Sequence, residues 1–339
     1  MTHHYFRGAD AIEAVDLDAV LPVVDRSAQD APANYAADPA TTQAVNVAVY
    51  LGMPLLLTGD PGTGKTQLAY RIAAEFGLGE PLVFETKSSS VAQDLFYSFD
   101  ALRRFSAAQV TTDTDPASRA DALDPRRFVR YQALGKAILG ACEPEVAAPW
   151  LPPGTPAQVP RRSVVLIDEI DKAPRDFPND LLNEIARRAF QVLEIGDGRI
   201  EAPAHRLPIV VITSNSEKQL PDAFLRRCVY HHIEPPDAGK LADIVSRRLP
   251  RILAAQGFVR SAIAFFLVLR DDASQLAKKP STAELLNWLD ALDGDGLVPA
   301  QSFAQQAARV ARNLPALVKS REDAAAAQEA LADFLRRGG

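Results

Sequence analysis

Short apolar runs alternate along the first 235 residues with segments in which apolar positions recur at helical spacing. The run 54–58 lies between Gly52 and Gly59 and contains no charged position, which is typical of a strand buried on both faces of a parallel sheet. The predicted strands occupy 54–58, 81–86, 163–168, 207–213 and 228–233, with helical patterns between them that include 40–50, 66–76 and 180–190. This alternation predicts an α/β fold, a five-stranded parallel sheet with helices on both faces.

Beyond Pro236 the pattern is helical only. Ser281 and Glu284 have the spacing of a capping box that opens one of the predicted helices. The apolar periodicity predicts helices at 238–249, 260–270, 282–292, 300–313 and 321–336. We therefore expect an α/β domain over 35–235 and a small all-α lid domain with C-terminal helices over 236–339. Residues 1–34 are interpreted as an arm or linker.

The connection between the second and third predicted strands is unusually long. It contains pieces rich in Ser and Ala, in Asp and in Pro, so we interpret about 94–160 as an insertion rather than a single crossover helix. Arg126, Arg127 and Arg130 form a local basic cluster in this region. Nearby aspartates at 113, 115, 121 and 124 offset the cluster, so no nucleic-acid groove is expected there.

A phosphate-binding motif follows the first predicted strand. Residues 59–66 read Gly-Asp-Pro-Gly-Thr-Gly-Lys-Thr and match GxxxxGK[ST] between a buried strand and a helix. Glycines let backbone amides turn toward phosphate oxygens, and the following helix adds the positive end of its dipole. Lys65 supplies a charge for the β- and γ-phosphates, and the Thr66 hydroxyl is a Mg²⁺ ligand. The predicted nucleotide-contacting residues are Gly59, Asp60, Pro61, Gly62, Thr63, Gly64, Lys65, Thr66 and Gln67.

Two carboxylates end the third predicted strand, where ligands of open parallel sheets bind. Asp168 is expected to hold Mg²⁺ together with Thr66, and Glu169 to polarise the attacking water. Asp171 follows in a loop and is interpreted as a solvated or capping residue. ATP and Mg²⁺ are therefore the predicted cofactors.

Composition narrows the class of protein. With a net charge of -6, the chain has no global attraction to nucleic acid or to anionic membranes. Its two cysteines, Cys142 and Cys228, form no motif, so we expect buried thiols and a reducing, cytoplasmic setting. No uninterrupted apolar run approaches 18 residues and the N-terminus lacks a signal-peptide core, so no membrane span is expected. His231 and His232 are neighbours in a strand and point to opposite faces, so they cannot share a metal.

From about residue 35 to 293 the chain resembles AAA+ ATPases and, more narrowly, their MoxR-like branch. The resemblance rests on PLLLTGDPGTGKT at 54–66, QDLFY at 93–97, LIDEID at 166–171, DLLNEI at 180–185 and SNSEKQLPDAFLRRC at 214–228. It implies that Asn215 is the sensor 1 residue, an amide that helps to position the hydrolytic water. It also implies that Arg226 or Arg227 is an arginine finger that completes the site of a neighbouring subunit.

One position departs from that family. The resemblance implies a sensor 2 arginine at the start of a lid helix, but the corresponding position falls near Ala283. Lys278 or Lys279 could substitute for it, although a lone lysine there is more often exposed. The coupling of nucleotide state to the lid is therefore an open question at this point.

The resemblance implies an ATP-hydrolysing, ring-forming homo-oligomer, six-membered by the family's habit. Such a ring would act as a chaperone-like remodeller or assembly factor on a protein client, often beside a partner with a von Willebrand factor A domain. The alternative is a nucleotide-dependent oligomerising switch with little turnover, which the missing sensor 2 arginine leaves open. A nucleic-acid motor is disfavoured by the acidic balance and by the lack of a recognisable DNA-binding module.

Overall fold

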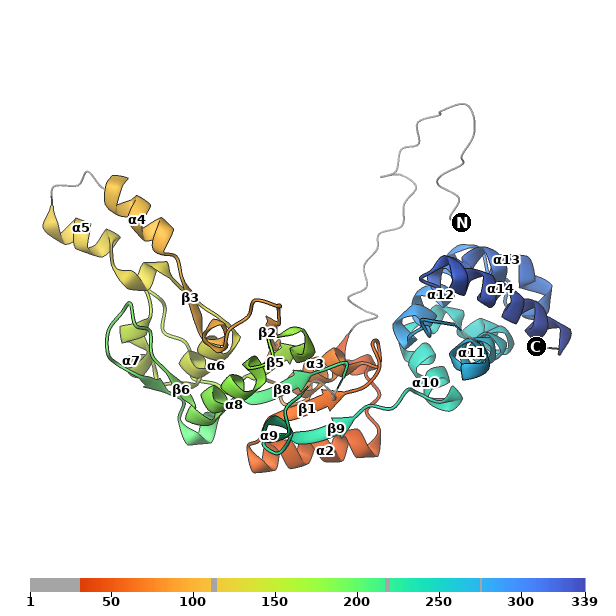
Figure 1. The fold of residues 1–339 in the computed structure, drawn as a ribbon, viewed down its shortest axis with the longest axis horizontal. Helices are drawn as coiled ribbons and strands as arrows, with labels where there is room; N and C mark the ends of the chain where they lie inside the picture. The colour runs from red at the N-terminus through yellow and green to blue at the C-terminus, as the bar shows by residue number, and fades with distance from the viewer. Residues whose placement is uncertain (1–30, 111–114, 217–219, 275, 339) are drawn as a thin grey trace. The chain divides into compact units, whose positions relative to one another are not determined.

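The computed structural model describes residues 31–110, 115–216, 220–274 and 276–338, and its chain forms two compact units (Figure 1). One unit holds Ala37–Gly59 and Lys65–Ile233. The other holds the chain from Glu234 onward together with Asp60–Gly64 and the stretch that ends at Ala36. The first 30 residues of the predicted arm lie outside the described residues.

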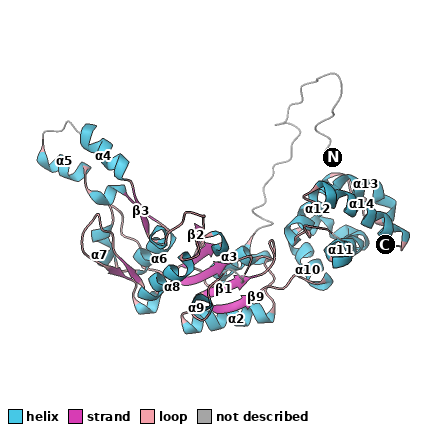
Figure 2. Ribbon diagram, viewed as in Figure 1, coloured by secondary structure: helices cyan, strands magenta, loops and turns pink. Residues whose placement is uncertain are grey.

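A five-stranded parallel sheet forms the centre of the first unit (Figure 2). Its strands are β1 (Leu55–Thr58), β2 (Leu82–Glu85), β5 (Val164–Asp168), β8 (Ile209–Thr213) and β9 (Val229–His232), in the order β2-β5-β8-β1-β9. All four neighbouring pairs are parallel. The three inner strands are almost wholly buried, whereas the edge strands β2 and β9 expose alternate residues. All five predicted strands are present, which confirms the predicted fold class.

Helices flank this sheet. They are α2 (Pro39–Leu51), α3 (Lys65–Glu75), α6 (Ala133–Ala141), α8 (Phe177–Arg187) and the short α9 (Asp222–Leu225). The carboxylate of Asp38 accepts the amide of Thr41 at 2.7 Å and caps α2, which Gly52 ends in a left-handed conformation. α3 packs on β5 and β8, and α2 packs on β9 and β1. The sheet is therefore shielded by the helices that the sequence places between its strands.

The long connection consists of two different parts. β3 (Tyr97–Phe99) pairs antiparallel with β4 (Val129–Tyr131), and between them α4 (Ala101–Val110) and α5 (Pro116–Ala122) project away from the sheet (Figure 1). α6, by contrast, packs on β2 and β5 and is part of the same hydrophobic core. The interpretation of 94–160 as an insertion therefore has to be corrected for α6, because this helix covers the sheet. The short α7 (Pro144–Ala147) follows it.

Two more strands form a small hairpin before β8. β6 (Ala189–Phe190) and β7 (Ile200–Glu201) are antiparallel, and residues 196–198 lie in the loop between them. These residues therefore belong to the tip of a β-hairpin. Leu193 lies in the same loop with 70% of its surface exposed.

The second unit has its own hydrophobic core. Its helices are α10 (Ala238–Arg248), α11 (Gln256–Arg270), α12 (Thr282–Gly294), α13 (Ala307–Asn313) and α14 (Arg321–Arg336). Rings of Phe258, Phe265, Trp288, Phe303 and Phe334 pack against one another inside it. The predicted capping box is present, because Ser281 N–H donates to Glu284 Oε2 at 2.6 Å. The predicted helix 300–313 instead begins as a 3₁₀ turn, Ala304–Gln306, and becomes α-helical at Ala307.

Among the described residues, one helical segment, Pro250–Arg270, is long and apolar enough to cross a membrane by length and composition. Half of its most apolar window is buried inside the protein. Phe258, Phe265 and Phe266 lie in this segment and are at most 1% exposed. A core helix of a soluble protein passes the same test, so this observation is weak support for a span.

A close approach between α6 and the chain before β3 gives a test of this packing. A Cβ atom on Gly135 would lie 2.0 Å from the carbonyl oxygen of Phe96, whereas a Cβ on Gly140 would meet nothing within 4 Å. We expect Gly135→Ala to lower the free energy of unfolding by about 1–3 kcal/mol, because the backbones must separate. Gly140→Ala, on the same helix, should raise it by about 0.5–1 kcal/mol. Urea unfolding of both variants measures the difference, and equal midpoints would contradict the placement of α6.

Candidate functional site

The loop between β1 and α3 needs glycine at positions 62 and 64. Gly62 and Gly64 have φ angles of 76° and 93°, which side-chain-bearing residues rarely adopt. A Cβ on Gly62 would lie 2.7 Å from the Cβ of Ser281, and one on Gly64 would lie 3.1 Å from the Tyr35 ring. The chain can therefore make this sharp turn and lie close to its neighbours only because these positions lack side chains.

Lys65 begins α3 and points back over the loop. Its side chain is 7% exposed, and its Nζ donates to the carbonyl oxygen of Gly59 at 2.7 Å and to Oδ1 of Asn215 at 2.9 Å. Asn215 follows β8, the neighbour of β1 in the sheet. The structure thus brings together the predicted phosphate-binding lysine and the residue that the resemblance implies to be sensor 1.

Thr66 lies beside the end of β5. Its hydroxyl donates to Oδ1 of Asp168 at 3.1 Å. Hydroxyl and carboxylate oxygens are the ligands that Mg²⁺ prefers, so this pair fits the ion. Among the described residues, no group of three His, Cys, Asp or Glu side chains is arranged to hold a metal. A Mg²⁺ ion here would therefore complete its coordination with nucleotide oxygens and water.

Glu169 has an unusual backbone conformation. Its φ and ψ of 54° and 53° are left-handed, which costs a non-glycine residue about 1–3 kcal/mol. Its carboxylate forms an ion pair with Lys172 and raises the pKa of that lysine. The carboxylate is therefore held by its own chain at the end of β5, next to Asp168.

Thr213 is a site residue that the sequence analysis missed. Its hydroxyl donates to Oδ1 of Asp168 and accepts the backbone N–H of Glu169 at 2.9 Å. This one hydroxyl connects both carboxylate residues to the end of β8. The signal in the sequence was a polar side chain that ends an otherwise apolar strand, which by itself has no specific meaning.

Asp171 follows in the 3₁₀ turn Ile170–Lys172 and caps the chain beyond β8. Its Oδ1 accepts the backbone N–H of Asn215 at 3.1 Å. Of the two interpretations that the sequence allowed, capping is the one seen.

Arg226 and Arg227 do not lie with Lys65, Asp168 and Asn215. Both are exposed, they follow α9, and Arg227 donates to Oδ1 of Asn183 on α8 at 3.1 Å. They precede β9, which runs parallel to β1, so they lie at the amino-terminal edge of the sheet. Lys65, Asp168 and Asn215 follow the carboxyl ends of their strands. The structure therefore separates the two arginines from the site of their own chain.

The unit that contains Asp60–Gly64 also contains the position where sensor 2 was sought. Ala283 is there, 3.7 Å from where a Cβ on Gly62 would lie, and Lys279 is paired with Asp272. Arg270, which the sequence analysis did not consider, donates to Oδ2 of Asp60 at 2.8 Å. An arginine thus binds the phosphate loop at its acidic side chain.

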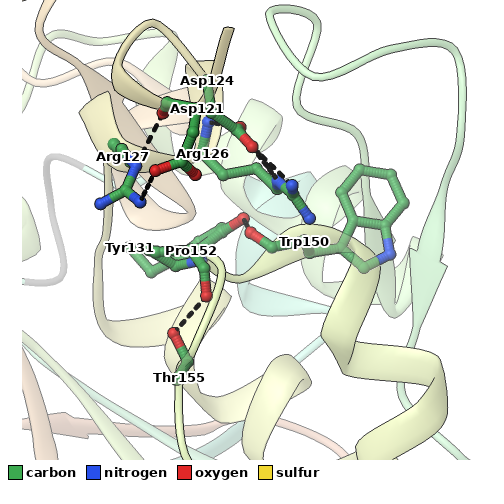
Figure 3. A network of polar contacts seen from close by, with 8 residues as sticks. All are labelled: Asp121, Asp124, Arg126, Arg127, Tyr131, Trp150, Pro152 and Thr155. Atoms are coloured by element: carbon green, nitrogen blue, oxygen red, sulfur yellow. Dashed lines mark hydrogen bonds and ion pairs between the residues drawn. The ribbon is translucent and has the colours of Figure 1, made fainter. Parts of the chain in front are cut away.

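The predicted basic cluster is largely neutralised within its own segment (Figure 3). Arg126 Nε donates to Oδ1 of Asp124 at 2.9 Å, and Arg127 Nη2 donates to Oδ2 of Asp121 at 2.6 Å. The Arg126 guanidinium lowers the pKa of Asp124. Two of the three arginines in the cluster, Arg126 and Arg127, therefore form ion pairs with nearby aspartates.

Residues 54–228 match the family model described as an AAA domain of the dynein-related subfamily. No curated protein matches the chain.

Solved structures with similar folds include NtrX from Brucella abortus in complex with ADP, at 13% identity and a TM-score of 0.43. That match covers 89% of this chain, which spans only 62% of the NtrX chain. A mutant of Thermotoga maritima RuvB matches at 16% identity and a TM-score of 0.37, and the match covers 80% of this chain and 73% of that chain. The Thermotoga maritima RuvB Holliday junction branch migration motor matches at 18% identity and a TM-score of 0.35, and the match covers 80% of this chain and 72% of that chain. At such identities and TM-scores, the family match alone identifies the class of protein.

The reactivity of the two buried cysteines, Cys142 and Cys228, tests whether either thiol is accessible in the folded protein. Burial raises the pKa of Cys228 to about 12 and also raises that of Cys142. At pH 8 about one Cys228 in 10,000 is then a thiolate, so we expect neither cysteine of the native protein to react with a thiol reagent within minutes. Ser118→Cys on the exposed surface of α5 is the positive control, and both native thiols should react in denaturant. Rapid labelling of a native cysteine would contradict the burial of these side chains.

Proposed function

The chain belongs to the dynein-related subfamily of AAA domains, and from this premise we propose that it is a Mg²⁺-dependent ATPase. One observation carries the proposal. Lys65, Thr66, Asp168, Glu169 and Asn215 follow the ends of three neighbouring strands. One hydrogen bond joins Lys65 to Asn215, and a second group of hydrogen bonds joins Thr66 to Asp168 and, through Thr213, Asp168 to Glu169. A lysine, two metal-ligand oxygens, a carboxylate and an amide are the groups that phosphoryl transfer to water requires.

We propose the following roles for these residues. Residues 59–67 cradle the phosphates, and Lys65 moves its ammonium from Gly59 and Asn215 to the β- and γ-phosphate oxygens. Thr66 and Asp168 hold Mg²⁺, which when bound neutralises charge on the phosphates. Glu169 orients the water and accepts its proton as the bond to the γ-phosphorus forms and the bond to ADP breaks. Asn215 holds the water or a γ-phosphate oxygen in place.

The positions of the arginines support an assembly in which sites lie between subunits. Arg226 and Arg227 are at the opposite edge of the sheet from Lys65, so one of them can reach only the site of a neighbour. A head-to-tail contact of this kind closes into a ring when its rotation allows, and we propose a ring-shaped homo-oligomer of six subunits, the number habitual in the family that the sequence resembles.

For the wider role we propose a MoxR-like, chaperone-like remodeller or assembly factor that acts on a protein client. We propose that it works beside a partner with a von Willebrand factor A domain. The projecting α4 and α5 support a client-binding role, because Leu102 and Phe105 on α4 are 81% and 62% exposed. The proposed boundaries remain 35–235 for the α/β domain and 236–339 for the lid, supported by the change of unit at Glu234.

A specific observation favours the second candidate, an oligomerising switch with little turnover. Lys172 holds the carboxylate of Glu169, and Ala283 stands where a sensor 2 arginine was sought. Slow hydrolysis would follow if this ion pair persisted when ATP is bound.

Two substitutions separate binding from hydrolysis. Lys65→Ala should weaken ATP binding by about two orders of magnitude, because it removes a buried charge that pairs with phosphate. Glu169→Gln should leave the Kd for ATP nearly unchanged and lower kcat by about 10²- to 10⁴-fold, because an amide cannot accept the proton. Binding of a fluorescent ATP analogue and release of phosphate measure the two effects.

The matched control for the carboxylate is Glu80→Gln, the same chemical change at an exposed position before β2. It should hydrolyse ATP at the wild-type rate. Turnover by Glu169→Gln at that rate would show that another group is the base, and negligible turnover by the wild type would favour the switch.

Mixing experiments test the shared site. Arg226→Ala/Arg227→Ala protein and Lys65→Ala protein should each be nearly inactive, since a finger contributes on the order of 10³-fold to turnover. Mixed together they should regain activity, because some interfaces then combine an intact loop with an intact finger. A mixture of Lys65→Ala with Glu169→Gln is the control and should stay inactive, because every site carries a lesion. Failure of the first mixture to exceed the second would contradict the shared site.

A further inference from the structure

The backbone around Asn215 lies beyond the last hydrogen bond of the sheet. The N–H of Ser214 donates to the carbonyl oxygen of Leu57 at 2.9 Å, and β8 itself ends at Thr213. The next N–H, that of Asn215, donates to Oδ1 of Asp171 at 3.1 Å. The first backbone N–H beyond the hydrogen bonds of the sheet is therefore bound by a side chain, that of Asp171.

This contact joins two strand ends that carry different parts of the site. Asp171 is in the turn that follows Glu169, and Asn215 is the residue whose Oδ1 accepts the Lys65 ammonium at 2.9 Å. The direction of a side chain is set by its backbone, so a displaced Asn215 amide nitrogen displaces the side-chain amide as well. Asp171 touches neither Lys65 nor Thr66 in the hydrogen bonds described above and would act on them through Asn215.

We propose that Asp171 is a positioning residue for Asn215, which fixes the sensor amide relative to Glu169 and the phosphate loop. The kinetic part of this inference rests on the proposed ATPase function. The structural part does not, because it concerns only the hydrogen bond from the Asn215 N–H to Oδ1 of Asp171.

The substitutions follow from hydrogen-bond chemistry. Asp171→Ala removes the acceptor, whereas Asp171→Asn keeps an oxygen of the same reach and removes only the charge. Asp176→Ala is the matched control, because Asp176 is exposed on the same stretch of chain and its side chain makes no capping hydrogen bond.

Hydrogen–deuterium exchange without nucleotide tests the contact directly. The amide of Asn215 should exchange about tenfold or more faster in Asp171→Ala, because an unbonded N–H outside the sheet is accessible to water. Asp171→Asn and Asp176→Ala should exchange as the wild type does. Unchanged exchange in Asp171→Ala would overturn the proposal, whether or not the protein hydrolyses ATP.

Kinetics then test whether Asp171 acts through Asn215. Asp171→Ala should lower kcat by about 10- to 100-fold with the Kd for ATP changed less than about threefold, and Asp171→Asn should restore most of the rate. In a double-mutant cycle, adding Asp171→Ala to Asn215→Ala should cost less than about twofold more.

The outcomes are distinguishable from failure of the proposed function. Additive losses in the cycle would show that Asp171 acts by another route and would overturn the inference. A parallel loss of ATP affinity and thermal stability in Asp171→Ala would also overturn it, because it would indicate general damage to the fold. If the wild type binds but does not hydrolyse ATP, the ATPase proposal fails, and the exchange experiment still decides whether Asp171 holds Asn215.

Discussion

The bonds from the first turn of α3 to the ends of β5 and β8 hold the candidate site together. Lys65 is almost fully buried, and placing an ammonium there costs several kcal/mol unless acceptors replace its water. Two of these acceptors are the carbonyl oxygen of Gly59, just after β1, and Oδ1 of Asn215, just after β8. Thr66 forms the matching bond to Asp168. The first turn of α3 is therefore bound to the strand ends that carry the other site residues.

The parallel arrangement of the strands explains why residues distant in sequence meet here. Strands β1, β5 and β8 run in the same direction, so the residues that follow them collect at one edge. Apolar side chains within the strands hold this edge in register, and the polar side chains lie only where the strands end. Thr213 shows how the register matters, because its hydroxyl meets Asp168 and Glu169 across two adjacent strands.

The sequence was sufficient for features that depend on local pattern. Continuous apolar runs predicted the strands, and the glycine motif with Lys65 predicted the loop that follows β1. It was insufficient where a role depends on neighbours in space. Thr213 and Asp171 became recognisable only through Asp168, Glu169 and Asn215. α6 was taken as part of an insertion because its surroundings are polar and irregular, yet Gly135 brings it against the backbone of Phe96 in the core.

The common direction of the strands also constrains which arginines can complete the site. The loop, the carboxylates and Asn215 occupy the carboxyl edge, and Arg226 and Arg227 precede β9 at the amino edge. No rearrangement short of unfolding β9 brings either arginine to Lys65 of the same chain, because β9 pairs with β1 along its whole length. A second copy has no such constraint, since its amino edge can approach this carboxyl edge from outside. If Arg226 or Arg227 acts on the γ-phosphate, it therefore acts at the site of a neighbouring copy, and hydrolysis then depends on assembly.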